Sequence, residues 1–377
     1  MFLSNMYSHP NKKLHTHLMN VAQACVTKSQ SPLHNLSSFF DTSIWQDLIW
    51  LMGFSHDFGK ATHFFQTYLF EPNEQIRMTL KQSPTTNHSL LSAVFAFWII
   101  QAYAKSHPVH HELFGMMPFL IFLIIKKHHG NIHNPIPVPD ETTNDLPETE
   151  SEVSHLDAQL QAIDVHELNY LFDIIGQHVN ISLCSSMLPE SFVYYFKQSI
   201  RARAQRTQFK RVVQHTAYYI IFQWLYSLLL HSDKTDAIFN EPFYSTPVKL
   251  DEQAVKKFKQ THFGKPQNQM DHIREAIFSD AEQTIATMDL RHRILSLNVP
   301  TGTGKTLTTL SVALQLQHRL LHEKKSQYKI IYALPFTSII DQNYHVFSQI
   351  FDQPNANMLL KHHHLADISY QTDENEF

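Results

Sequence analysis

Apolar residues recur at helical spacing from residue 1 to about residue 235. Glycine is rare in this range and strand-like alternation is scarce, so the pattern predicts an all-helical domain. Its longest apolar runs lie near residues 90–103, 113–125 and 217–230. A helix needs roughly 18 or more apolar residues to cross a membrane. We therefore expect these runs to form buried helices of a soluble protein that has no membrane partner.

The pattern changes after residue 238. The segment FNEPFYSTPVKLDEQ, residues 239–253, carries two prolines and follows the last helical run. Farther on, RILSLNV at 293–299 and YKIIYAL at 328–334 have the composition of strands, and a helical stretch separates them. Strand, helix, strand is the order of a parallel α/β unit. The sequence therefore predicts an all-α domain over residues 1–238, a linker over 239–270 and a partial α/β domain over 271–377.

The composition is typical of a soluble globular protein. At 377 residues the chain is long enough for two domains, and 43% of its residues are hydrophobic. Cys25 and Cys184 are too few for a disulfide framework, which indicates a reducing, cytoplasmic location. The formal net charge of -4 excludes a global field that attracts nucleic acid, so any contact with DNA must be local.

One short segment, FSHDFGKATHFFQ at residues 54–66, holds a histidine and an aspartate side by side. Adjacent helical residues point roughly 100° apart, so His56 and Asp57 can serve one site only at a helix edge, or when two metal ions share it. Imidazole ligands suit transition metals, and a carboxylate can bridge two cations. Other candidates at the edges of apolar helical runs are His17, His88, His128, His129 and Asp233.

These five imidazoles and two carboxylates are enough for two ions, with Asp57 as the bridging group. The chain has 27 histidines, and a single histidine is more commonly a surface or satisfied core residue than a ligand. His15 competes with His17 for the first position, but only His17 is followed by apolar positions at helical spacing. The ordered set, rather than any one member, indicates the metal site.

The order of these residues resembles the HD phosphohydrolase superfamily. The segments HDFGKATHFFQ, NHS, KKHHG and SLLLHSDKTD resemble the HD nuclease domain of type I CRISPR-associated helicase-nucleases. The resemblance implies an all-α HD domain that cleaves single-stranded DNA and is recruited to the Cascade effector complex. It also implies two divalent ions of manganese, iron, nickel or cobalt, catalysis by Asp57, and Lys60 steadying the scissile phosphate. The implied metal ligands are His17, His56, Asp57, His88, His128, His129 and Asp233.

A glycine-rich loop, LNVPTGTGKTLTTL at residues 297–310, lies between the first predicted strand and the helix. In such loops the backbone amides hold nucleotide phosphates, the lysine neutralises them and the hydroxyl binds magnesium. Val299 stands where the full P-loop pattern has its first glycine, a departure that resembles superfamily 2 helicases. The pattern predicts that ATP with magnesium is bound by Thr301, Gly302, Thr303, Gly304, Lys305 and Thr306.

The flanking segments extend the resemblance to helicases. YALPFTSIIDQN at 332–343 resembles a motif that contacts the DNA backbone, and LLKHHHLAD at 359–367 resembles the segment that follows it. A working motor also needs an acidic DExH-type motif and a second RecA-like domain. TDENEF at 372–377 has no apolar strand before it, so we interpret it as an acidic tail. We therefore expect a partial RecA-like domain that does not hydrolyse ATP or translocate on its own.

Local contacts with nucleic acid are predicted at two places. The densest basic segment contains Arg201, Arg203, Arg206, Lys210 and Arg211. These residues can follow phosphates, but a solvated helix face explains them equally well. Lys126 and Lys127 lie beside His128 and are better placed to draw a strand toward the metal site.

Two alternatives to the nuclease stay open at this stage. The first is an HD phosphohydrolase that acts on nucleotides or cyclic dinucleotides, with the P-loop segment as a nucleotide sensor. The second is a binding module that contacts DNA or Cascade without cleaving. A bridging acid, two consecutive imidazoles and an adjacent lysine favour the nuclease, because a structural metal site rarely needs them.

Overall fold

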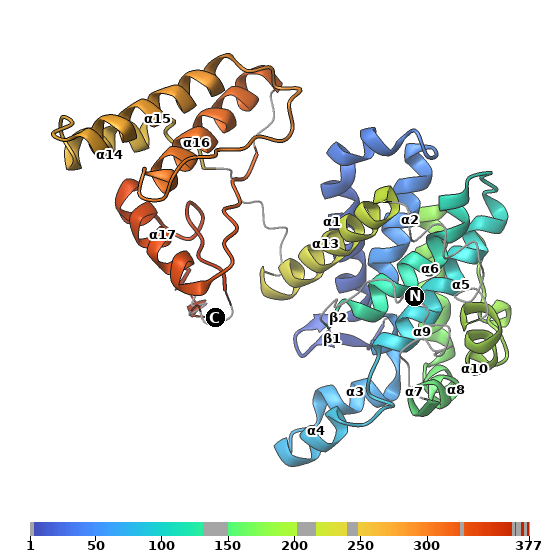
Figure 1. The fold of residues 1–377 in the computed structure, drawn as a ribbon. Helices are drawn as coiled ribbons and strands as arrows, with labels where there is room; N and C mark the ends of the chain where they lie inside the picture. The colour runs from blue at the N-terminus through green and yellow to red at the C-terminus, as the bar shows by residue number, and fades with distance from the viewer. Residues whose placement is uncertain are drawn as a thin grey trace. The chain divides into compact units, whose positions relative to one another are not determined.

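The computed structural model describes residues 4–130, 150–201, 216–239, 248–324 and 328–363, together with five residues between 366 and 376. The chain divides into two compact units, Met1–Phe243 and Tyr244–Phe377 (Figure 1). Most of the basic segment at 201–211 lies outside the described residues.

The first unit is helical apart from a short antiparallel hairpin of β1 (Tyr7–His9) and β2 (Lys12–Lys13). Its α-helices are α1 (Leu14–Leu33), α2 (Thr42–Ser55), α3 (His63–Phe70), α4 (Glu74–Lys81), α5 (Ser89–Ser106), α6 (Glu112–Lys127), α7 (Glu150–Ser154), α8 (Leu156–Gln161), α9 (Val165–Val179), α10 (Phe192–Tyr195) and α13 (Thr216–Phe239). Short 3-10 turns are η1 (His34–Leu36), η2 (Phe58–Ala61) and η3 (Ser185–Met187), and η4 (Phe196–Arg201) is π-helical. The predicted helical first domain is confirmed.

Polar caps set where several of these helices begin. Asp41 accepts a hydrogen bond from the backbone amide of Ser43 at the start of α2, and Thr62 accepts one from Phe65 at the start of α3. Such caps satisfy amides that the first helical turn leaves without partners. Because Thr62 begins a new helix, η2 remains a separate short turn between α2 and α3.

Five long helices enclose the hydrophobic core of the first unit. Helix α1 packs against α2 and α13, and α5 packs against α2 and α6 (Figure 1). Gly53 permits a close contact between α1 and α2, because a Cβ there would lie only 2.6 Å from the Cα of Ala22. Trp45, Phe95 and Phe122 are fully buried in this core. Burial of each such side chain stabilises the fold by about 2–3 kcal/mol.

The three predicted apolar runs belong to the core helices α5, α6 and α13. Of the described helices, α5 alone is long and apolar enough to cross a membrane by length and composition. Within the protein, 72% of that stretch is buried. The apolar character of α5 is thus explained by its packing in the core.

The second unit contains four helices among its described residues: α14 (Ala254–His262), α15 (Gln269–Thr287), α16 (Lys305–Lys324) and α17 (Thr337–Ile350). They meet in a small core of Ala254, Val255, Phe278, Leu310, Leu314 and Phe347. Helix α14 lies within the interval predicted as a linker, and the domain boundaries themselves stay a prediction.

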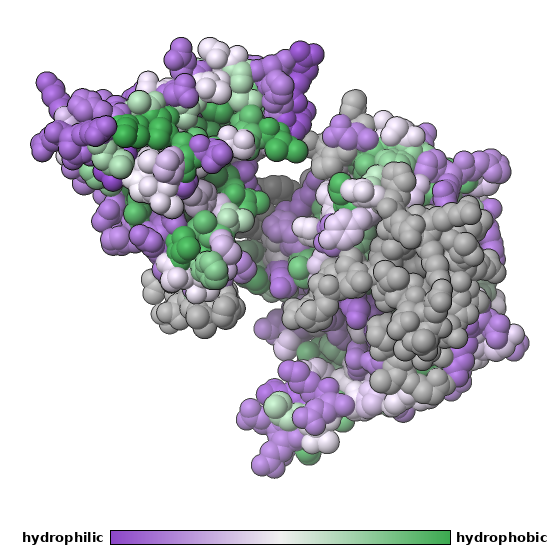
Figure 2. Space-filling model, in the orientation of Figure 1, coloured by the Kyte–Doolittle hydropathy of each residue, from purple (hydrophilic) through white to green (hydrophobic). Residues whose placement is uncertain are grey.

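The two segments predicted as strands are not paired with one another. Residues 293–299 and 328–334 have no strand ladder, and the strand pair of this unit is the short antiparallel β3 (Gln371–Thr372) with β4 (Asn375–Glu376). Ile294 is 92% exposed and Ile331 is 87% exposed. Figure 2 shows apolar patches on the surface of this unit. A strand needs a neighbour for its hydrogen bonds, and no described segment supplies one here, so the parallel pairing differs from the prediction.

Candidate metal centre

The His-Asp pair lies at a break between two helical segments. Helix α2 ends at Ser55, His56 follows as its C-terminal cap, and Asp57 precedes η2 as its N-terminal cap. The backbone leaves helical geometry here, from φ -59° at His56 to φ -117° at Asp57. Both side chains are fully buried and face one site. This is the helix-edge position that the sequence pattern required.

The other five candidates come from four further helices. They are His17 in the first turn of α1, His88 directly before α5, His128 and His129 directly after α6, and Asp233 in α13. The structure brings all seven candidates together in two groups that share Asp57. The inner group is His17, His56, Asp57 and Asp233, and the outer group is Asp57, His88, His128 and His129.

The inner group faces one oxygen of Asp57. Nε2 of His17 lies 3.3 Å from Asp57 Oδ2 and 3.4 Å from Asp233 Oδ1. Nε2 of His56 lies 3.4 Å from Asp57 Oδ2 and 3.3 Å from Asp233 Oδ1. Two imidazoles and two carboxylates therefore surround one point in the protein interior.

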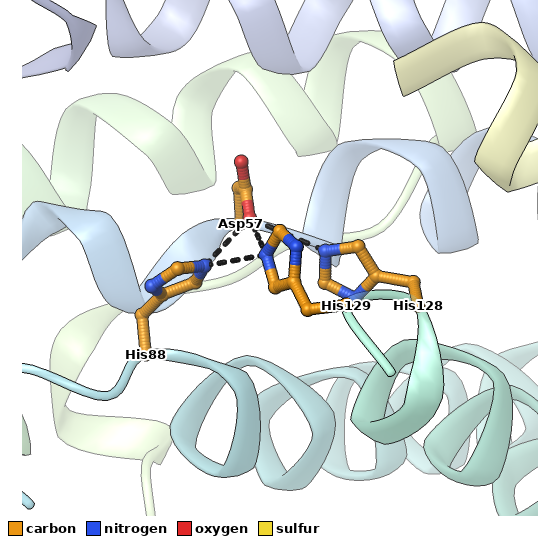
Figure 3. A group of neighbouring side chains, drawn as sticks. All are labelled: Asp57, His88, His128 and His129. Atoms are coloured by element: carbon orange, nitrogen blue, oxygen red, sulfur yellow. Dashed lines mark hydrogen bonds and ion pairs between the residues drawn. The ribbon is translucent and has the colours of Figure 1, made fainter. Parts of the chain in front are cut away.

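The outer group faces the other oxygen of the same carboxylate (Figure 3). Nε2 of His88, His128 and His129 lies 3.1, 3.5 and 3.6 Å from Asp57 Oδ1. The Nε2 atoms of His88 and His129 are 2.9 Å apart. The side chain of His129 is 46% exposed, so this group lies nearer to solvent than the inner one.

The spacing within each group fits metal ligands. Nitrogen and oxygen ligands lie about 2.0–2.2 Å from a transition-metal ion, which places neighbouring ligands of one ion roughly 3.0–3.5 Å apart. Within the two groups, four buried atoms have no hydrogen bond of suitable geometry, although one of them, Asp57 Oδ2, forms an ion pair with Lys60: His17 Nε2, His128 Nε2 and both carboxylate oxygens of Asp57. Buried polar atoms without partners are costly, and cations at the two points would satisfy all four. The residues present therefore fit two metal ions.

Hydrogen bonds on the opposite ring nitrogen orient three of the imidazoles. Nδ1 of His56 is 2.7 Å from the carbonyl oxygen of Gly53, and Nδ1 of His128 is 2.5 Å from that of Ile125. Nδ1 of His17 is 2.6 Å from Asp236 Oδ2. Because Nδ1 donates in each case, the lone pair of Nε2 is directed at the metal position.

Carboxylates keep the inner imidazoles protonated in the metal-free protein. Burial lowers the pKa of both rings, but it is outweighed. The nearby carboxylates of Asp233, Asp236 and Asp57 raise the pKa of His17 to about 9. The charge of Asp57 and contacts with Asp233 raise the pKa of His56 to about 10. A cation entering this group would displace these protons.

In the outer group, burial lowers the pKa of two imidazoles. Burial lowers the pKa of His88 to about 4, and the nearby Asp57 offsets it only in part. Burial also lowers the pKa of His128. These two rings are therefore neutral at physiological pH and carry lone pairs suited to a transition metal.

Lys60 completes the buried charge arrangement. Its Nζ lies 2.7 Å from Asp57 Oδ2, and the residue is 7% exposed. Burial raises the pKa of Asp57, but the charges of Lys60 and His56 outweigh it and hold that pKa well below its usual range. Asp57 is therefore ionised, as a bridging ligand has to be.

A cavity of about 440 Å³ adjoins the centre. It is lined by His128, His129, Gly130, Gln223, Tyr226, Leu230, Asp233 and Lys234. Three of these residues belong to the inner or outer group, so the candidate centre is accessible from this cavity. Its volume is in the range of small-ligand sites.

The structure also separates competing candidates and adds one residue. His15 belongs to neither group and packs against Tyr170, with ring centroids 5.5 Å apart. Asp236, which sequence reasoning did not select, contacts His17 directly. Its position three residues after Asp233 places both carboxylates on one face of α13, a spacing that could have identified it.

The glycine-rich loop of the second unit ends at the first residue of α16, Lys305. Gly302 and Gly304 have φ values of 78° and 85°, which residues with a side chain rarely adopt. Nζ of Lys305 donates to the carbonyl oxygen of Val299 at 2.7 Å, and Nε of Arg274 donates to that of Gly302 at 3.0 Å. The loop therefore has the glycine conformations and the helix start of an anion site.

Two parts of the chain match known protein families. Residues 6–183 match the family described as Cas3, HD domain, and residues 278–375 match the family described as DEAD/DEAH box helicase. A CRISPR-associated nuclease/helicase Cas3 from Haloferax volcanii is 24% identical over 349 residues, which cover 85% of this chain and 35% of that protein. The chain thus spans about a third of the length of this curated relative. No solved structure matches the chain significantly. The resemblance found in the sequence motifs is confirmed.

Proposed function

Because the chain carries a Cas3-type HD domain followed by a DEAD/DEAH box helicase region, we propose that it is a metal-dependent nuclease of a type I CRISPR system. Its substrate is single-stranded DNA, its cofactors are two divalent ions of manganese, iron, nickel or cobalt, and its partner is the Cascade effector complex. The protein acts in the cytoplasm. Asp57 and Lys60 are its catalytic residues, and the members of the inner and outer groups are its metal ligands.

One observation carries this proposal: the two oxygens of the Asp57 carboxylate face different groups. Oδ2 faces His17 and His56 at 3.3 and 3.4 Å, and Oδ1 faces His88 at 3.1 Å and two further imidazoles. A carboxylate that binds a single ion needs imidazole ligands around only one of its oxygens. The arrangement supports a bridging ligand between two cations.

The proposed chemistry is in-line displacement at a phosphodiester. Two bound ions supply Lewis acidity and a water-derived nucleophile at neutral pH. The protein contributes the fixed donor set, a largely dry interior around Asp57, and the ammonium of Lys60. A positive charge at Lys60 Nζ favours the negative charge that accumulates on the phosphoryl oxygens in the transition state.

The cavity beside the centre supports a polymeric substrate. Its lining includes the ligands His128 and Asp233 together with Lys234 and Tyr226. A lysine can pair with a phosphate, and an aromatic ring can stack on a base. A strand lying in this cavity would place one phosphate near the outer group.

The second unit supports nucleotide binding as a separate property. The Gly302–Lys305 segment leads into the amino end of α16, where backbone amides are available to phosphates. We assign ATP with magnesium to this loop, held by Thr301, Gly302, Thr303, Gly304, Lys305 and Thr306.

The decisive experiment combines metal removal with substitution of Asp57. The protein is stripped with EDTA, reconstituted with manganese, nickel or cobalt, and assayed on single-stranded DNA, cyclic dinucleotides and mononucleotides. We expect two ions per chain and cleavage of DNA that EDTA abolishes and metal restores. We expect Asp57→Asn to lose both ions and to lower the rate by about 10³-fold or more, equivalent to roughly 4 kcal/mol of transition-state stabilisation.

Asp47→Asn provides the matched control. Asp47 also accepts a short hydrogen bond, from Tyr103 at 2.6 Å, but it lies nine residues before His56 on α2, roughly 14 Å along the helix. This variant should keep both ions and full activity. Turnover of nucleotides without cleavage of DNA would support the phosphohydrolase alternative, and binding of DNA without any turnover would support the binding module.

A further inference from the structure

Asp236 lies behind the inner group, on the far side of the His17 ring. Its carboxylate Oδ2 is 2.6 Å from Nδ1 of His17, whereas Nε2 of the same ring faces Asp57 and Asp233. Asp236 is 6% exposed. It is a member of neither group of candidate ligands. The imidazole thus lies between one carboxylate that orients it and two that share its metal position.

Two donors besides His17 hold the Asp236 carboxylate. Nζ of Lys12 lies 2.5 Å from Oδ2 and donates to the backbone carbonyl oxygen of Asp236 at 2.8 Å. Nδ2 of Asn20 donates to Oδ1 at 2.9 Å. These donors come from β2 and α1, more than two hundred residues earlier in the chain. With both oxygens engaged, the carboxylate cannot rotate away from His17.

His17 differs in this respect from the two other imidazoles with a defined Nδ1 partner. His56 and His128 donate to the neutral backbone carbonyls of Gly53 and Ile125. A carboxylate is a stronger acceptor than a carbonyl, so it fixes the proton on Nδ1 more firmly and makes Nε2 a more basic ligand.

We propose that Asp236, held in place by Lys12 and Asn20, is a positioning residue that fixes the ring and tautomer of His17 for the inner metal ion. This inference rests on the proposed metal centre. Partners of this kind typically contribute a factor of about 10–100 in metal affinity. The effect is specific to the inner ion, because Asp236 contacts no member of the outer group among the described residues.

The test is a manganese titration followed by electron paramagnetic resonance, which counts free ions, on the unaltered protein and on Asp236→Asn. We expect two sites in the unaltered protein. We expect Asp236→Asn to weaken one site by about 10–100-fold and to leave the other unchanged. Asp47→Asn is the control, because it removes a half-buried carboxylate that contacts a tyrosine instead of a ligand.

A second measurement needs no variant. In the zinc-loaded unaltered protein, ¹⁵N NMR of the histidine rings should show the His17 proton on Nδ1. A proton on Nε2 overturns the inference, as do two unchanged affinities in Asp236→Asn or an equal loss in Asp47→Asn. All three results leave the proposed function intact. If the unaltered protein binds no ions, the proposed function itself fails.

Discussion

Substitution of Gly59 tests how closely η2 packs against His88 at the start of α5. It lies between Asp57 and Lys60, and its backbone passes directly against His88. A Cβ at this position would lie 2.6 Å from the carbonyl oxygen of His88 and 2.9 Å from its Cβ. Ordinary contacts begin at 3.4 Å, so Gly59→Ala requires a displacement of about 0.8 Å.

Neither backbone is free to make this displacement. The carbonyl oxygen of His88 accepts the first helical hydrogen bond of α5, from the amide of Ser92 at 3.0 Å. The amide of Gly59 donates to Ser92 Oγ at 2.9 Å. Overpacking of a buried region costs about 1–3 kcal/mol, so we expect Gly59→Ala to lower the free energy of unfolding by about 2 kcal/mol. A shift of roughly 1 Å in a ligand can reduce the rate about 100-fold, so metal affinity of the outer group and DNA cleavage should fall together.

Urea unfolding followed by circular dichroism measures the first effect, and manganese titration measures the second. Gly115→Ala is the control, because a Cβ at this helical glycine meets nothing within 4 Å. It should leave metal binding unchanged and stabilise α6 by up to about 1 kcal/mol. Unaltered stability and unaltered metal affinity in Gly59→Ala would refute the close approach of η2 to His88.

Two further predictions concern pH and thiol chemistry. Carboxylate contacts raise the pKa of His17 to about 9 and that of His56 to about 10, so the protonated rings stabilise the metal-free protein. This stabilisation is complete below pH 6.5 and is lost as the pH rises through the two raised pKa values. The melting temperature of EDTA-treated protein should therefore fall between pH 6.5 and 9, while that of metal-loaded protein should not; parallel curves would contradict the assignment. Burial raises the pKa of Cys25 to about 12, whereas Cys184 is exposed, so a thiol reagent at pH 8 should modify one cysteine in the native protein and two after unfolding. Rapid modification of two native thiols would show that α1 is not packed as described.

The sequence located the candidate centre because its histidines stand at helix ends. An apolar run marks a core helix, and a polar residue at the edge of that run stands out against it. His56, His88 and His128 all have this position, directly after or before α2, α5 and α6. Helix ends of one bundle tend to meet at the same end of the core, so local patterns predicted a convergence that spans more than two hundred residues.

Contacts made by ordinary polar residues could not be predicted in the same way. Lys12 and Asn20 are ordinary polar residues of the sequence, and their contacts with Asp236 depend on how α13 docks against α1. Strand pairing in the second unit failed for a related reason. Residues 293–299 and 328–334 have the apolar, β-branched composition that favours strands. A strand forms, however, only where a neighbouring strand is present to pair with it.

The donor sets of the two groups differ, and this difference bears on which ions they would hold. The inner group has two carboxylates and two imidazoles, whereas the outer group has three imidazoles and one oxygen of Asp57. Carboxylate-rich sites suit manganese, and imidazole-rich sites suit nickel, cobalt and iron. An ion in the inner group also withdraws charge from Asp57, which weakens the only anionic ligand of the outer group. We therefore expect an ion in the outer group to be the more weakly held of the two, although His128 and His129 of that group line the cavity.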